Sequence, residues 1–322
     1  MGSSPFSCLS IRGGRTVSGM SPVIFAIIPI FGLILIGFVL RRLEFPGRDF
    51  WPVSERLTYY VLFPALLVSG MSGRSFDGAA MGLALTLAAA ICLVGAFLML
   101  IRNMFSMDGP TFTSVFQGAI RPNTYVGLSA SAALLGPDWM TLSAVALLTL
   151  VPLVNVLCVL VLSRHGKHGG GLARVGLELV KNPLILACGV GMLLNVTGVA
   201  LPALLNDLLV ILGKAALPMG LLAVGAGLRM EGLGEGALPV GLASLAHLVA
   251  LPLAAYGCAQ LLGVTGFARD AALIYTAIPV SVSAFILARQ MGGDHRVMAL
   301  IITVETALSA VTMPVILGVL GS

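Results

Sequence analysis

The chain has 322 residues, of which 58% are hydrophobic and 10% are charged. Soluble domains carry about 25% charged residues, so this composition excludes a soluble enzyme, a nucleic-acid-binding protein and a disordered chain. Charge-poor stretches recur along almost the whole length and predict an all-α polytopic membrane protein, whose first expected partner is the lipid bilayer.

Ten apolar stretches are each long enough to cross the hydrocarbon core as a helix, which takes about 20 residues. We expect them near residues 21–40, 55–71, 79–101, 113–136, 139–163, 182–199, 204–228, 237–262, 271–290 and 297–319. Residues 1–19 are polar, lack a leader cleavage pattern and are predicted to be a disordered N-terminal tail. Residues 164–181 are basic and predict a linker, and Asn182 is expected to cap the span that follows it.

The distribution of Lys and Arg predicts the orientation of the ten spans. Most of the 18 Lys and Arg residues would lie on one face, together with those of the linker. That face is expected to be cytoplasmic, which makes 164–181 a cytoplasmic linker and places both termini on the non-cytoplasmic side.

Five spans on each side of the linker predict two inverted repeats, 20–163 and 182–322, because an odd number of spans reverses the second repeat. The spacing from Pro29 to Pro64 equals the spacing from Pro183 to Pro218. Further along, Pro122 of the fourth span corresponds to Pro279 of the ninth. Chance pairing is the alternative, because proline is frequent in these spans.

Pro122 and Pro279 are expected to break the fourth and ninth helices near the middle of the bilayer, since proline removes a backbone donor and clashes with the preceding turn. Interrupted helices at matching positions of inverted halves indicate a transport site. A pair of ordinary proline kinks is the alternative. The expected substrate-binding residues flank the two breaks: Arg121, Asn123, Thr124, Ser281 and Ser283.

Arg121, Lys214 and Glu305 fall near the middle of their spans, where a charge on a lone helix costs at least about 2.5–3.5 kcal/mol. The excess is positive, with His247 as a further candidate cation, and suits an anionic substrate. Arg121 can hold a carboxylate through two hydrogen bonds or form a structural ion pair with Glu305, and both readings stay open. Glu305 and Lys214 are the candidates for proton or charge coupling, although we expect Lys214 to lean toward Asp207 or reach an interface.

Several short motifs recur in an order that resembles the auxin efflux carrier family, which includes bacterial malate and malonate permeases. They are Ile28–Gly37 with Arg41 and Arg42, Arg121 with Asn123 and Thr124, Asn182–Leu186, Leu212–Pro218, and Ala277–Pro279 with Ala288–Gly292. The resemblance runs from Met20 to the end of the chain.

This resemblance implies ten helices with crossed, broken fourth and ninth helices. Spans one, two, six and seven would form a scaffold, and the remaining spans would form a moving transport core. It also implies that Asn123 contacts a substrate carboxylate. Glu305 departs from the family pattern, in which an uncharged polar residue is usual at this position.

The expected function is secondary active transport of a small organic anion, such as a mono- or dicarboxylate, by alternating access in the bacterial inner membrane. The alternatives are a sodium-coupled bile-acid-type symporter, a sodium/proton antiporter, an intramembrane enzyme, and a channel or receptor. No catalytic motif, metal-ligand spacing or nucleotide-binding loop occurs in the sequence, so no catalytic residue, metal or cofactor is predicted. Association into a homodimer stays open.

Overall fold

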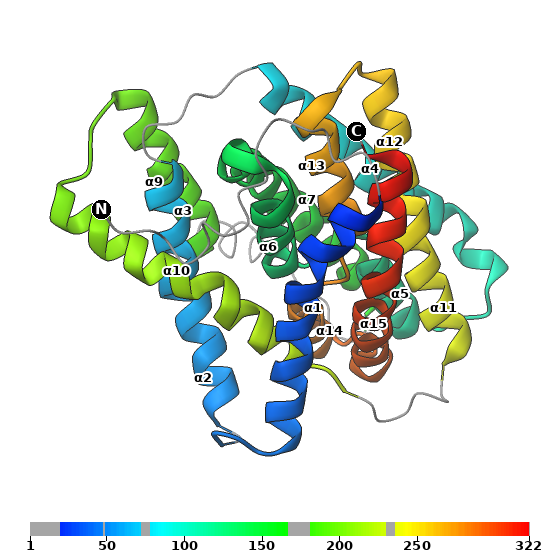
Figure 1. Ribbon diagram of the computed structural model, residues 1–322. Coiled ribbons are helices and arrows are strands. Elements are labelled where there is room, and N and C mark those ends of the chain that lie inside the picture. The colour runs from blue at the N-terminus through cyan, green and yellow to red at the C-terminus, as the bar shows by residue number, and fades with distance from the viewer. Residues whose placement is uncertain (1–19, 48, 72–77, 167–180, 230–235, 322) are drawn as a thin grey trace.

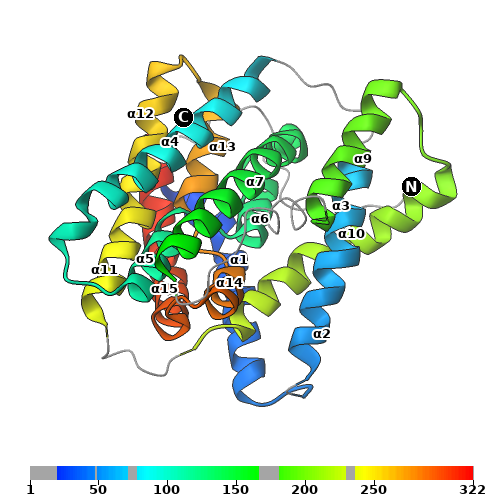
Figure 2. The ribbon, with the colours of Figure 1, turned by 180° about the vertical axis from the view of Figure 1, so that it is seen from behind.

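The computed structural model describes residues 20–47, 49–71, 78–166, 181–229 and 236–321. Within these residues every regular element is helical, and the extended pairing is confined to one isolated antiparallel bridge. The helices form the bundle shown in Figure 1 and, from behind, in Figure 2. The expected tail 1–19 and most of the expected linker 164–181 lie outside the described residues.

The α-helices follow one another along the whole described chain, and two of them continue into π-helical turns. The elements are α1 (Met20–Arg42), α2 (Phe50–Leu57), the π-helical η2 (Thr58–Leu62), α3 (Phe63–Met71), α4 (Gly78–Ile101), α5 (Gly109–Ile120), α6 (Thr124–Leu134), α7 (Trp139–His165), α9 (Pro183–Thr197), α10 (Ala203–Ala226), α11 (Ala237–Leu245), the π-helical η5 (Ala246–Ala250), α12 (Leu251–Leu261), α13 (Gly266–Ala277), α14 (Ser283–Met291) and α15 (His295–Leu320).

Six helical segments among the described residues are long and apolar enough to cross a membrane. They are Pro22–Arg42, Ala80–Met104, Trp139–His165, Ala203–Ala226, Ala237–Leu261 and His295–Leu320. The other expected spans fall on helices that are shorter or that divide into two pieces. The all-helical membrane class is therefore supported.

Polar caps set several helix starts at positions that differ from the expected span limits. Asp108 accepts a hydrogen bond from the Thr111 backbone N–H at 3.1 Å, so α5 begins before the apolar stretch that starts at 113. The Asp294 carboxylate caps α15 in the same way. The predicted cap at Asn182 is confirmed, because its side chain accepts from the Leu184 N–H at 3.0 Å.

The helices pack into two groups that lie side by side in both views (Figures 1 and 2). One group combines α1, α2, α3, α9 and α10, and the other contains the remaining helices. A buried apolar cluster joins the groups through Phe63 and Leu67 of α3, Leu128 of α6 and Leu147 of α7. The first group contains the segments that the resemblance implies for a scaffold.

Candidate functional site

Two interruptions in helical structure meet inside the bundle. The first separates α5 from α6, with Arg121 and Asn123 outside the helical conformation at ψ values of 83° and 103°. The second separates α13 from α14 and begins at Ile278, whose ψ is 159°. Pro122 lies in the first interruption and Pro279 in the second. Both prolines are buried.

The two interruptions are joined by reciprocal backbone hydrogen bonds. The Asn123 N–H donates to the Pro279 carbonyl at 2.9 Å, and the Ser281 N–H donates to the Arg121 carbonyl at 2.8 Å. Between these bonds, Pro122 and Val280 form the isolated antiparallel bridge. Buried backbone groups that lose their helical partners need others, and here each segment supplies partners to the other. We call this pair of segments, residues 121–123 and 278–282, the crossing.

Arg121, Ser281 and Ser283 come together on one side of the crossing. Arg121 Nε donates to Ser283 Oγ at 3.4 Å, and the two serine hydroxyl oxygens are 2.8 Å apart. Arg121 Nη1 is buried and has no hydrogen-bond partner within the described part of the chain. A guanidinium with a buried, unpartnered N–H can bind an oxyanion without first giving up another bond.

The polar side-chain atoms of Asn123 are hydrogen-bonded to backbone groups. Its Oδ1 accepts from the Tyr125 and Val126 N–H groups at 3.1 and 3.4 Å and so caps α6. Its Nδ2 donates to the Val280 carbonyl at 3.5 Å, which ties α6 to the second interruption. Asn123 is 2% exposed, whereas Thr124, the first residue of α6, is half-buried.

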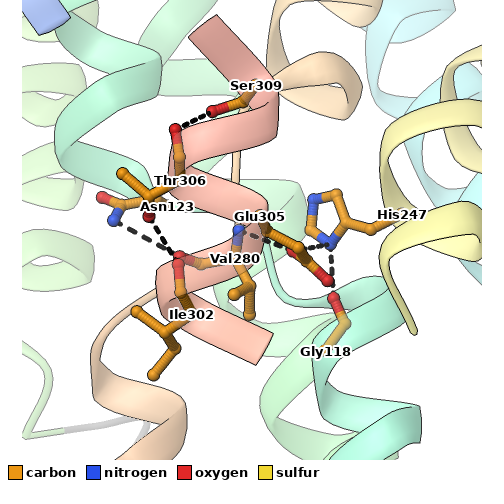
Figure 3. Close-up of polar contacts among 8 residues, drawn as sticks. All are labelled: Gly118, Asn123, His247, Val280, Ile302, Glu305, Thr306 and Ser309. Atoms are coloured by element: carbon orange, nitrogen blue, oxygen red, sulfur yellow. Dashed lines mark hydrogen bonds and ion pairs between the residues drawn. The ribbon is translucent and has the colours of Figure 1, made fainter. Parts of the chain in front are cut away.

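Glu305 is fully buried in α15 and contacts the crossing through the Val280 N–H, which donates to its Oε2 at 3.1 Å. Its titratable neighbour is His247, with Nδ1 3.5 Å from Oε2 (Figure 3). Arg121 was expected either to bind a carboxylate or to form an ion pair with Glu305. The structure does not show that ion pair, because Arg121 Nε is hydrogen-bonded to Ser283. Sequence reasoning gave no partner for His247, because a π-helical turn changes which residues of the segment face inward.

Lys214 does not join this site. It lies on the exposed face of α10, the same face that carries Asp207 and Ile211. A charged residue in the middle of an apolar helix therefore does not have to lie at the crossing, since its side chain can lie on the outer face of the helix.

A cavity of about 830 Å³ lies beside the crossing and between the two helix groups. Val282, the last residue of the second interruption, lines it, and so do Glu55 of α2 and Phe285 of α14. Four arginines also line the cavity: Arg41, Arg42, Arg229 and Arg289. The sequence marked these arginines as part of one basic face, but their convergence on one cavity depends on tertiary packing. A cavity with such an excess of positive charge attracts anions.

Arg229 is held at the cavity wall from two directions. Its backbone N–H and carbonyl both bond the Thr303 hydroxyl of α15, at 3.0 and 2.8 Å. Its guanidinium lies over the Phe285 ring, 4.7 Å from the centroid. These contacts fix one cationic group where the end of α10 meets α14 and α15.

For metals, no cluster of three or more His, Cys, Asp or Glu side chains occurs in the described ranges.

Comparisons with known proteins find similarity to membrane transport proteins. The model of a family described as membrane transport proteins matches residues 172–317. An uncharacterized transporter of Methanothermobacter thermautotrophicus is 23% identical over 294 residues, which is 89% of this chain and 95% of that protein. Together with the apolar helices, these similarities support an integral membrane protein that acts as a transporter.

Proposed function

We propose that the chain is a secondary active transporter of a small organic anion, a mono- or dicarboxylate, and that it works by alternating access. The observation that carries this proposal is the arginine-lined cavity, which reaches the crossing at Val282. An anion would be drawn into the cavity and then bound beside the crossing by Arg121, Ser281 and Ser283. The helix N-termini of α6 and α14 lie at the crossing and also favour negative charge.

In this proposal, residues 20–163 and 182–322 form two inverted five-helix repeats. The α5–α6 and α13–α14 pairs are the broken fourth and ninth helices, which supports a total of ten spans. The reciprocal hydrogen bonds at the crossing support such a symmetric pairing, because each interruption donates one backbone N–H to the other. The basic face is cytoplasmic, the membrane is a bacterial inner membrane, and both termini lie on its other side.

Transport would consist of movement between the two helix groups. The group of α1, α2, α3, α9 and α10 would act as the scaffold, and the group that holds the crossing would move against it. The cavity between the groups is consistent with access from the basic face, because its four arginines belong to that face. Closing this cavity and opening its counterpart on the other side would carry the bound anion across.

The proposal is tested with purified protein in liposomes and a binding screen of malate, malonate, related carboxylates and indole acids. The screen is repeated with Arg121→Ala and Asn123→Ala, and with Arg269→Gln as a control that removes a positive charge at the start of α13. We expect uptake and binding of at least one carboxylate, weakened in the first two variants only. Failure to move any carboxylate under any pH or sodium gradient would contradict the proposal, and a strict sodium requirement would favour a sodium-coupled symporter.

A further inference from the structure

Glu305 and His247 form a buried titratable pair behind the crossing. Both side chains are 0% exposed, and Glu305 Oε2 lies 3.5 Å from His247 Nδ1. Glu305 comes from the middle of α15, and His247 comes from the π-helical turn η5 (Figure 3). Such turns interrupt regular helices and occur frequently at functional sites. A charge-bearing pair at this depth requires an explanation, because isolation from water disfavours each ionised group.

Glu305 is hydrogen-bonded to the second segment of the crossing, and His247 is hydrogen-bonded to the helix that leads into the first segment. The Val280 N–H donates to Glu305 Oε2 at 3.1 Å. His247 Nδ1 donates to the carbonyl of Gly118, which lies in the last turn of α5 just before the first interruption. The carbonyl has no hydrogen to give, so Nδ1 must carry one. A change in the protonation of the pair therefore acts on one backbone group of the crossing and on one in the last turn of α5 before it.

The pair has two open positions for one further proton. Glu305 Oε1 and His247 Nε2 are buried, and neither has a hydrogen-bond partner among the described residues. A carboxylate with a neutral imidazole carries one negative charge, and one added proton makes the pair neutral whether it binds Oε1 or Nε2. Burial favours the state without net charge. The geometry therefore describes a site for a single exchangeable proton.

Other titratable or charged groups on α15 and on the elements packed against it lie away from the pair. Arg121 faces Ser283, while Arg41, Arg42 and Arg289 line the cavity. Tyr275 of α13 packs against Gly127 of α6, and Arg269 lies over the Tyr256 ring. Asp270 is the fifth residue of α13, and His295 and Arg296 are in the first turn of α15. His247 is thus the titratable side chain that directly faces Glu305.

The donors around Glu305 favour a proton over a metal cation. Oε2 faces the Val280 N–H on one side and the protonated His247 Nδ1 on another. Hard cations such as sodium are held by several oxygen ligands. The Val280 N–H directed at Oε2 would repel such a cation, and the Nδ1–H that His247 donates to the Gly118 carbonyl lies close by, whereas Oε1 is left free to take a proton.

We propose that Glu305 and His247 form the proton-binding site that couples anion transport to proton movement, with one proton and one anion crossing in the same direction. This inference rests on the proposed function. The unprotonated pair places a negative charge one hydrogen bond from the crossing and repels an anion there, whereas the protonated pair does not. Proton and anion therefore bind cooperatively, and each raises the affinity for the other by the same factor.

Transport by the protein in liposomes tests this coupling, with radiolabelled malonate as the probe. For the wild type we expect an inward proton gradient to drive malonate accumulation, and the affinity to rise about tenfold for each unit of falling pH in the titrating range. Glu305→Gln keeps an acceptor for the Val280 N–H but cannot exchange a proton. It should lose both the accumulation and the pH dependence while retaining malonate exchange. Asp207→Asn, an exposed carboxylate on α10, should behave like the wild type.

Infrared spectroscopy gives a second readout that needs no substrate. The wild-type spectrum should contain a carboxylic-acid C=O band that titrates with pH and is absent from Glu305→Gln. In His247→Gln the same band should be present but shifted. Proton-driven accumulation by Glu305→Gln at the wild-type level, or the absence of such a band at every pH, would overturn the proposal. If the wild type binds no carboxylate, the proposed function fails, while the infrared titration still decides whether the proton site exists.

Discussion

Arg121 and Asn123 flank the same proline but differ in how their polar atoms are used. Arg121 keeps one buried N–H without a partner, whereas Asn123 uses its side chain to cap α6 and to bond Val280. Their replacements should therefore have different consequences. Substitution of Arg121 tests binding of the anion, and substitution of Asn123 must separate a structural role from a binding role.

For Arg121→Lys we expect the charge to be retained and the affinity for a carboxylate to fall about tenfold or more, because an ammonium cannot supply two parallel N–H groups. Isothermal titration or a thermal-shift assay with the carboxylate identified in the screen measures the loss. Arg269→Gln is the control, since it removes a full charge away from the crossing. An unchanged affinity in Arg121→Lys would contradict a two-pronged contact.

Variants of Asn123 separate the effect of losing the α6 cap from the effect on anion binding. Asn123→Ala removes the cap and should lower the free energy of unfolding by about 0.5–2 kcal/mol. Asn123→Asp keeps the accepting oxygen of the cap but replaces the Nδ2 donor to the Val280 carbonyl with a negative oxygen, so it should retain the α6 cap, lose the bond to Val280 and bind the anion more weakly. Thermal unfolding and binding assays on both variants check this pattern. Equal binding by Asn123→Asp and the wild type would place the anion away from the α6 N-terminus.

At the scale of elements, glycines determine how closely α1 and α10 approach. A side-chain carbon at Gly37 would collide with the Leu222 carbonyl, and one at Gly225 would collide with the Ile34 carbonyl. Close backbone approach through small residues is a common way for helices to associate in membranes. These two glycines therefore hold together the group of helices to which we assign the scaffold.

Gly225→Ala should lower the free energy of unfolding by about 1–3 kcal/mol, because the added methyl group forces the two backbones apart. Gly32→Ala is the matched control on α1, since a methyl group there meets no atom within 4 Å. Thermal unfolding in detergent, followed by size-exclusion chromatography, compares the two variants. Equal midpoints for both would show that the close α1–α10 packing does not contribute to stability.

The sequence predicted the helical segments well but not their ends or their inward faces. Apolar length indicated each segment, and Asn182 was predicted as a cap because its side-chain chemistry is local. By contrast, the start of α5 depends on Asp108, a polar residue outside the apolar stretch. The contact between His247 and Glu305 depends on a π-helical turn, which a regular 3.6-residue period does not predict.

At the scale of the whole molecule, the cavity gathers arginines from three separate parts of the chain. Sequence analysis could place them on one face from their positions between apolar stretches, because orientation depends on charge alone. It could not place Arg229 and Arg289 on a common cavity wall, since that requires α10, α14 and α15 to be packed together. The residues at the two interruptions could thus be named from the sequence, whereas the set of residues that lines the cavity beside them could not.

Combined replacement of Arg229 and Arg289 by Gln should weaken binding of a dicarboxylate by about tenfold and affect a monocarboxylate less, because the Coulomb energy scales with the ligand charge. Binding measured at low and high salt checks this, since salt screens the same interaction. The single variant Arg269→Gln is the control for loss of charge. Equal losses for both classes of ligand would contradict attraction by the cavity.

The backbone bonds between Asn123 and Pro279 and between Ser281 and Arg121 tie one half of the chain to the other. While these bonds hold, the two segments travel as a single piece. A solute bound there would meet the same arrangement of amides whichever compartment it entered from. At equal pH its affinity would then be similar on both sides, and the sense of net flow would follow from the anion and proton gradients that the cell maintains.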